Sequence, residues 1–207
     1  TELIKLSHAS SRSPDFIGIY TAEDLKKLQD DIAPFPGAIA KKIIESETKD
    51  IINNIFASFE EKPVASASVA QVHKGILKNG ETVAIKILRP NIEKLLFNDF
   101  HFFYWGAKCI EFFVPSAKRF NFSKNVEVLS EVSLSELDLT MEAAAAEELY
   151  ENFKDNINYR VPRINWEITS HKILIMESVY GVRIDDLVSL QKNNHDVKKI
   201  TEIGTEV

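Results

Sequence analysis

A lysine on a short predicted strand is the residue in this sequence best suited to chemistry. Lys86 lies in the run 83–88, and because side chains alternate along a strand, Ala84, Lys86 and Leu88 share one face. The small side chain two positions before the lysine leaves room for a flat ring, so this face suits a purine above Ala84 and phosphates near Lys86. The alternative is an edge-strand lysine that reaches water, because exposed lysines are the norm.

A run of small residues precedes this strand. Ala65, Ala67 and Ala70 fall where a Gly-x-Gly-x-x-Gly loop has its glycines, and Val72 follows at the usual place. A backbone that approaches phosphates needs small side chains and free N–H groups. Because alanine resists the positive φ that glycine accepts, we expect a stiffer loop than the glycine version. Plain packing of small side chains is the alternative explanation.

Acidic residues on a helix predicted over about 124–153 could provide a counter-charge for the lysine. Glu136, Asp138 and Glu142 belong to it. Asp138 and Glu142 would be neighbours one turn apart, whose like charges cost roughly 0.2–0.5 kcal/mol unless a cation is near. Lys86 could supply that cation to Glu142, as in the strand–helix ion pair of kinases. A solvated acidic helix face is the alternative.

Turn signals and periodicity predict the elements that must position these side chains. Residues 64–77 and 81–88 alternate as strands, and Asn79-Gly80 between them is the strongest short-range hairpin signal. Two further strands are predicted over 161–166 and 172–176. Other helices are predicted over about 21–31, 38–46, 49–57 and 91–114.

The composition excludes several classes of protein. The 207 residues carry a net charge of −6, so sequence-independent binding of nucleic acid is not expected. The single cysteine, Cys109, cannot form an internal disulfide. No apolar run approaches the ~20 residues that span a bilayer, so no transmembrane segment is predicted. The chain starts at Thr1 and not at Met, which indicates a fragment.

Together these motifs resemble the amino-terminal half of the UbiB-type atypical kinases, the aarF-domain family linked to ubiquinone biosynthesis. The resemblance extends over most of residues 1–190. Its markers are Leu-Gln-Asp-Asp at 28–31, Pro-Phe-Pro at 34–36, Phe-Ala-Ser-Phe at 56–59, the run 63–73 ending in Gln-Val-His, the run 83–90, Glu136, Asp138, Glu142 and Met176-Glu177.

This resemblance implies a fold and a division into domains. The implied class is α+β: a protein-kinase-like N-lobe, made of an antiparallel sheet plus helices, with an N-terminal helical extension and with the C-lobe missing. The extension would cover residues 1–60, the N-lobe with inserted helices 61–181, and the start of a truncated C-lobe 182–207.

The resemblance also implies roles for individual residues. Lys86 would be the nucleotide lysine with Glu142 as its helix partner, and Glu136 and Asp138 would be the family's Glu-x-Asp pair. Residues 176–179 would be a hinge whose backbone binds adenine. The expected nucleotide-binding residues are Ala65, Ser66, Ala67, Ser68, Val72, Ala84, Lys86, Glu177 and Val179.

Two departures from the family pattern change what is expected. The family's Lys-x-Gly-Gln segment, whose lysine pairs with the Glu-x-Asp residues, aligns with residues 5–8, where only Lys5 is retained. The family's catalytic loop and its Asp-Phe-Gly motif would lie beyond residue 207. The implied cofactor is therefore ATP with Mg²⁺, with the Mg²⁺ ligands mainly outside this chain and no metal site within it.

The function expected from the resemblance is that of an ATP-binding atypical kinase or ATPase supporting ubiquinone biosynthesis, although this fragment alone would be inactive. Implied partners are a nucleotide and either ubiquinone-pathway enzymes or an isoprenoid lipid. The implied location is the cytoplasmic side of a bacterial inner membrane or the matrix side of a mitochondrial one. A non-catalytic scaffold or decayed remnant is the alternative, because the C-lobe is missing and the Lys5 segment is altered. A ubiquinone ring hydroxylase is less supported, since no flavin-type glycine motif or iron-binding triad is present.

Overall fold

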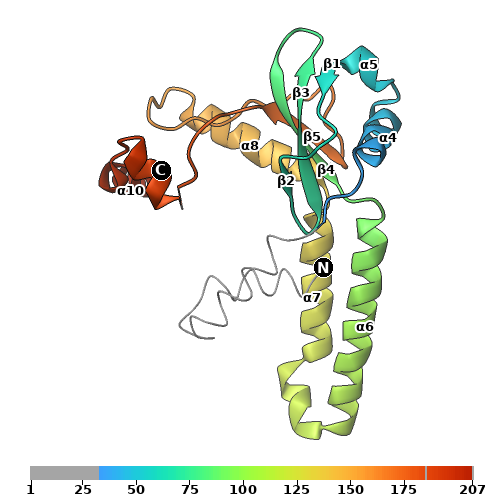
Figure 1. Ribbon diagram of the computed structural model, residues 1–207. Helices are drawn as coiled ribbons and strands as arrows, with labels where there is room; N and C mark the ends of the chain where they lie inside the picture. The colour runs from blue at the N-terminus through green and yellow to red at the C-terminus, as the bar shows by residue number, and fades with distance from the viewer. Residues whose placement is uncertain (1–32, 185, 207) are drawn as a thin grey trace.

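The computed structural model describes residues 33–184 and 186–206. An antiparallel five-stranded sheet lies at its centre, and a pair of long helices projects away from it (Figure 1). The strand order is β1–β3–β4–β5, and β2 also pairs with β3. The strands are β1 (Phe56–Phe59), β2 (Ala65–Ser66), β3 (Ala70–Leu77), β4 (Thr82–Leu88) and β5 (Ile173–Glu177).

The turn between β3 and β4 determines which residues face each other across the sheet. Gly80 has φ 89°, a conformation that glycine adopts readily, and its N–H donates to the Leu77 carbonyl at 2.9 Å. The resulting register pairs Lys86 with Val72 on one side and with Leu174 of β5 on the other. Lys86 therefore lies on an inner strand, and the edge-strand alternative is wrong.

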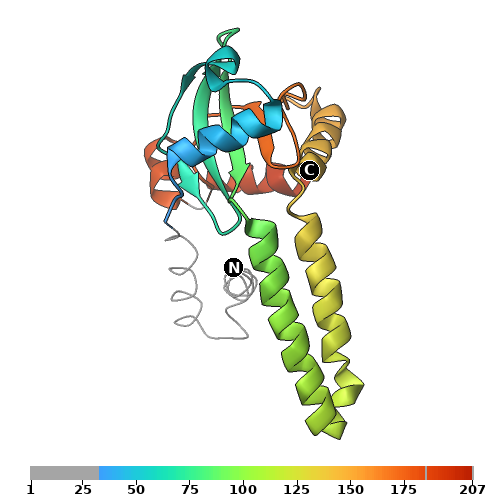
Figure 2. The ribbon, with the colours of Figure 1, turned by 90° about the vertical axis from the view of Figure 1, so that its right-hand side faces the viewer.

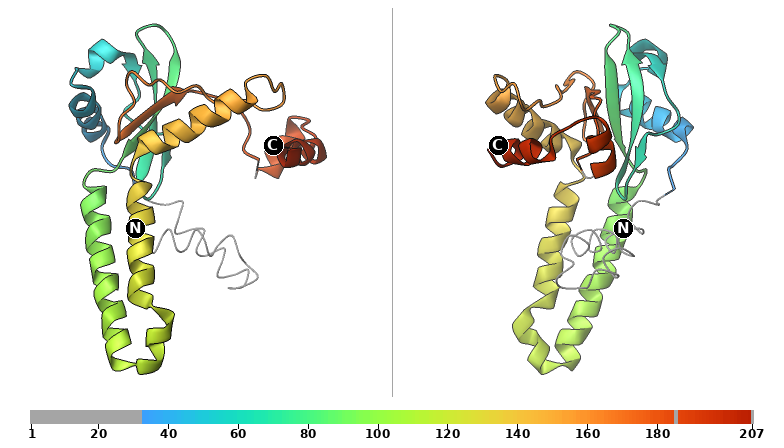
Figure 3. Two further views of the ribbon diagram at one scale, coloured as in Figure 1. Left: turned by 180° about the vertical axis from the view of Figure 1, so that it is seen from behind. Right: turned by 60° about the vertical axis from the view of Figure 1, so that its left-hand side comes forward.

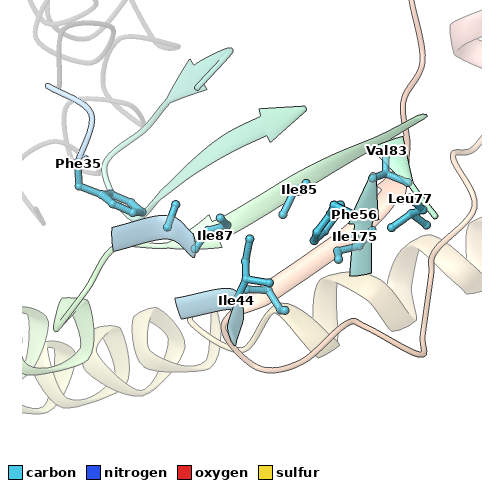
Figure 4. Packing of buried hydrophobic residues seen from close by; sticks show 10 residues of the cluster. Phe35, Ile44, Phe56, Leu77, Val83, Ile85, Ile87 and Ile175 are labelled. Carbon is cyan, nitrogen blue, oxygen red and sulfur yellow. The ribbon is translucent and has the colours of Figure 1, made fainter. Parts of the chain in front are cut away.

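One face of the sheet is covered by α4 (Gly37–Thr48), which crosses it obliquely (Figure 2). Val83, Ile85 and Ile87 of β4 point to this side, as the alternation predicts, and are at most 3% exposed. Figure 4 shows how the members of this core interdigitate. They are Phe35, Ala40, Ile44, Phe56, Leu77, Val83, Ile85, Ile87, Ile173 and Ile175.

The opposite face carries Lys86 and packs against three helices. These are α6 (Ile92–Phe113), α7 (Phe122–Ser135) and α8 (Leu139–Phe153). A second core joins the sheet to their near ends through Leu88, Leu96, Leu139 and Leu174, among others. Helices α6 and α7, joined by the 3₁₀ helix η1 (Pro115–Phe120), form an antiparallel hairpin that extends far beyond the sheet (Figure 3). None of the helices in the described part of the chain is long and apolar enough to cross a membrane.

The predicted helix over 124–153 is wrong as a single element. It is broken at residues 136–138, where Glu136 ends α7 and Asp138 caps α8 by accepting a hydrogen bond from the Thr140 N–H at 2.9 Å. Aspartate is among the strongest N-capping residues, so it favours a new helix start over continuation. Glu136, Asp138 and Glu142 consequently do not share one helix.

Two other elements differ from the predictions. The helix expected over 49–57 is the short α5 (Ile52–Ile55), because Phe56–Phe59 pairs with β3 as strand β1. The strand expected over 161–166 is reduced to an isolated bridge between Ile164 and Met176. The remaining helices are α9 (Leu187–Lys192) and α10 (Val197–Glu206).

Candidate nucleotide-binding site

Lys86 and Glu142 meet on the sheet face opposite α4. The Lys86 Nζ donates to both carboxylate oxygens of Glu142, at 2.8 and 2.6 Å. Glu142 lies in the first turn of α8, where a negative charge is favoured by the helix dipole. The two side chains are 26% and 47% exposed, so the pair is open to solvent on one side and accessible to a ligand.

Apart from a second lysine, Lys74, which pairs with Ala84 and lies over the Tyr180 ring, Lys86 has small or apolar neighbours on this face. Val72 lies beside it on β3, and Ala84 is two positions before it on the same strand. Ala84 pairs in turn with Met176 of β5, which leads into the predicted hinge. These pairings place Ala84 between Lys86 and the residue that leads into the predicted hinge.

The small-residue loop folds back between β2 and β3. Ala65 pairs with Val72, and the Ala67 N–H donates to the Ala70 carbonyl at 2.8 Å, which closes a tight turn. No residue from 65 to 70 adopts a positive φ, so the alanines impose no backbone strain here. Ala70 is 3% exposed and belongs to the second core, so the packing explanation holds for that alanine.

The tip of this loop presents donors that no protein group uses. Within the described part of the chain, neither the Ser68 nor the Val69 N–H donates to a protein acceptor. Ser68 also carries a hydroxyl and is half-buried. Adjacent free backbone N–H groups are the donors that bind phosphate oxygens in nucleotide loops.

Arg89 holds this loop in place and was missed by the sequence analysis. Its side chain donates to the Ala67 carbonyl at 2.9 Å, to the Ser66 hydroxyl at 2.8 Å and to the Ala33 carbonyl at 3.1 Å. Its backbone N–H also donates to the Val69 carbonyl at 2.8 Å. Partial burial lowers the pKa of Arg89 from its ordinary value, but a guanidinium stays charged. An arginine directly after a strand end was the available signal.

The predicted hinge lies at the end of β5. The Glu177 N–H donates to the Arg163 carbonyl at 2.9 Å, and its carboxylate pairs with Arg160. An adenine ring at this residue would therefore have to use the Glu177 carbonyl. The Val179 N–H has no described acceptor, and the residue is 53% exposed.

The Glu-x-Asp residues lie at the junction between α7 and α8. Asp138 accepts from the Thr140 hydroxyl at 2.6 Å and pairs with the His171 Nδ1 at 2.8 Å. The hydrogen bond from the Thr140 hydroxyl is the main cause that lowers the pKa of Asp138. Glu136 is exposed at the end of α7, and Lys5 lies outside the described residues.

Over residues 33–184 and 186–206, no group of three or more His, Cys, Asp or Glu side chains could hold a metal ion.

Comparison with known proteins shows which family this chain belongs to. The sequence pattern of the family described as "ABC1 atypical kinase-like domain" matches residues 27–207. Proteins called "Probable protein kinase UbiB" are 36% identical in Cellvibrio japonicus and 37% identical in Pseudomonas aeruginosa, each over 204 residues. Those matches include 99% of this chain but only 37% and 38% of the relatives, so the chain spans less than two-fifths of their length.

A solved structure, the complex of Rv3197 with erythromycin from Mycobacterium tuberculosis, has a similar fold. It matches with a TM-score of 0.58 and 26% identity over 91% of this chain and 46% of that one. The predicted α+β, kinase-like N-lobe class and the predicted family are thereby confirmed. The chain belongs to the ABC1 atypical kinase-like family, with UbiB proteins among its relatives.

Proposed function

We propose that this chain forms the nucleotide-binding N-lobe of an ATP-dependent atypical kinase or ATPase. The observation that carries the proposal is the contact that Lys86, on an inner strand beside Val72 and Ala84, makes with both carboxylate oxygens of Glu142. An ammonium group on an inner strand is costly to bury unless it meets an anion. Because the face is open, that anion can also be a phosphate.

The arrangement supports specific roles for the chain's own residues. Glu142 would hold the Lys86 ammonium group toward the open face, where it would bind phosphate oxygens. The Ser68 and Val69 N–H groups would bind other phosphate oxygens, and the purine would lie over Ala84. Phosphoryl transfer also needs groups that hold Mg²⁺ and orient the acceptor. Those groups would belong to the part of the relatives' length that this chain does not span.

The biological setting is also a proposal, supported by the UbiB relatives. We place the activity in ubiquinone biosynthesis, at the cytoplasmic side of a bacterial inner membrane or the mitochondrial matrix side. Enzymes of that pathway or an isoprenoid lipid are the proposed partners.

Nucleotide titration of the intact protein tests the proposal. Lys86→Ala should weaken ATP binding about 10- to 100-fold, the range expected when a charge-assisted contact worth roughly 1.5–3 kcal/mol is lost. Lys78→Ala is the matched control, because Lys78 lies on the same hairpin but is exposed near its turn, away from this face. Equal affinity for wild type and Lys86→Ala would overturn the proposal, and absence of binding in both would favour a non-catalytic scaffold.

A further inference from the structure

The helical hairpin formed by α6, η1 and α7 exposes several large aromatic side chains to solvent. Phe102, Phe112 and Phe113 are 75%, 77% and 76% exposed, and Trp105 is 62% exposed. Large uncovered apolar surfaces on a soluble domain mark interaction sites. These side chains lie along the projecting part of the hairpin and do not belong to either core.

The two grooves along the hairpin differ in character. One groove, of about 390 Å³, is lined almost entirely by apolar residues, including Phe102, Phe103, Ile110, Phe122 and Leu129. We call this the apolar side. The other groove, of about 300 Å³, contains charged and polar residues such as His101, Glu127 and Glu131. The hairpin is therefore amphipathic as a unit.

The far end of the hairpin, residues 108–124, which we call the tip, is basic within an acidic protein. It contains Lys108, Lys118, Arg119 and Lys124 but only one acidic residue, whereas the whole chain has a net charge of −6. That acidic residue, Glu111, accepts hydrogen bonds from the Ser123 N–H and hydroxyl, both at 2.9 Å, and so joins α6 to α7. The four basic side chains at the tip are thus interleaved with exposed rings.

We propose that the tip and apolar side of this hairpin dock onto the surface of an anionic lipid bilayer. Exposed Phe and Trp side chains next to Lys and Arg match the interface, where rings enter the acyl boundary and cations bind phosphates. A second copy of the chain fits less well, because symmetric pairing of two tips would bring their like charges together. The tip lies far from the sheet, so docking leaves the face of Lys86 uncovered (Figure 3).

Vesicle flotation of the 207-residue chain tests this proposal independently of nucleotide binding. Binding to an equal mixture of phosphatidylcholine and phosphatidylglycerol should be at least about tenfold stronger than to phosphatidylcholine alone, because basic residues add affinity for anionic lipid. The double variant Phe112→Ser/Phe113→Ser should lose about tenfold or more of this binding. The double variant Lys118→Glu/Arg119→Glu should lose the preference for the anionic vesicles.

A matched control and two further readouts separate the possible outcomes. Ile157→Ser removes an even more exposed apolar side chain (97% exposed) elsewhere and should leave flotation unchanged. In a variant that carries Phe113→Trp together with Trp105→Phe and Trp166→Phe, the emission of the single tryptophan should shift to the blue with anionic vesicles only. Unchanged flotation of the Phe112/Phe113 variant, with thermal unfolding like wild type, would overturn the proposal. Light scattering would overturn the proposal in favour of pairing with a second copy of the chain if wild type formed a dimer without lipid and the Phe112/Phe113 variant did not.

Discussion

The ion pair between Lys86 and Glu142 should contribute little to folding, although it is central to the proposed nucleotide site. Both contacts are short, 2.6 and 2.8 Å, but the side chains are 26% and 47% exposed. Exposed pairs typically contribute 0.2–1 kcal/mol, because water screens the charges and two long side chains lose freedom. We therefore expect a coupling free energy of about 0.5 kcal/mol in a double-mutant cycle of Lys86→Met and Glu142→Gln.

Urea unfolding at low salt would measure this coupling, and roughly 0.5 M salt should reduce it because the Debye length shortens. The pair of Lys41 with Glu61 is a matched control, since its contact is also 2.6 Å and its side chains are 33% and 59% exposed. It should show a similar coupling and no effect on nucleotide affinity. A coupling above about 2 kcal/mol for Lys86 and Glu142 would mean that the pair is a structural element. That result would refute the reasoning, whereas a coupling near zero would not, because many exposed ion pairs contribute nothing measurable to stability.

Three other substitutions probe the elements around the site. Arg89→Gln removes the side-chain hydrogen bonds of Arg89 and should lower the free energy of unfolding by about 1–3 kcal/mol. Hydrogen exchange at the Ala67 amide should become faster, and unchanged exchange would contradict the role given to Arg89. Gly75→Ala would place its Cβ 2.8 Å from Ile85 Cδ1. The free energy of unfolding in urea should therefore fall by about 1–3 kcal/mol. An unchanged value would mean that this core can relax around the methyl group. Burial lowers the pKa of His73 in the folded chain below its ordinary 6.5. As the pH falls below 6.5, the unfolded chain therefore binds more protons than the folded chain, and the free energy of unfolding should decrease. His73→Gln should flatten this dependence between about pH 7 and 5, and an equally steep fall in the variant would assign it to other groups.

The placement of Lys86 was predictable because it depends on local rules. The alternation along residues 83–88 determines which side chains share a face, and the Asn-Gly turn sets the register of the hairpin. These two signals place Lys86 and Ala84 on the face opposite Ile85 without knowledge of the rest of the chain. The acidic residues after the predicted strands offered Glu142 as the partner, the family resemblance implied the same residue, and the structure brings the two together.

Other features depended on information that lies far away in the chain. Phe56–Phe59 forms a strand because it pairs with β3, whose residues follow more than ten positions later. The break at residues 136–138 had a local signal, the N-capping Asp138, but the alanine-rich run after it favoured one continuous helix. The exposure of Phe112 and Phe113 could not be predicted, because a periodic apolar pattern does not show whether another element covers it.

The conformation of the small-residue loop is set largely by residues outside it. A glycine loop can reorganise around phosphates because its backbone is free, but alanines restrict φ and here adopt no positive values. Arg89 and Gln71 fasten the loop and its strand to the segment before α4. The Gln71 side chain accepts a hydrogen bond from the Phe35 N–H at 3.0 Å and donates one to the Phe35 carbonyl at 3.2 Å. The Arg89 side chain donates to the Ala33 carbonyl. The loop and the start of the described chain thus form one hydrogen-bonded unit, so a change in either should alter how the Ser68 and Val69 N–H groups are presented to a nucleotide.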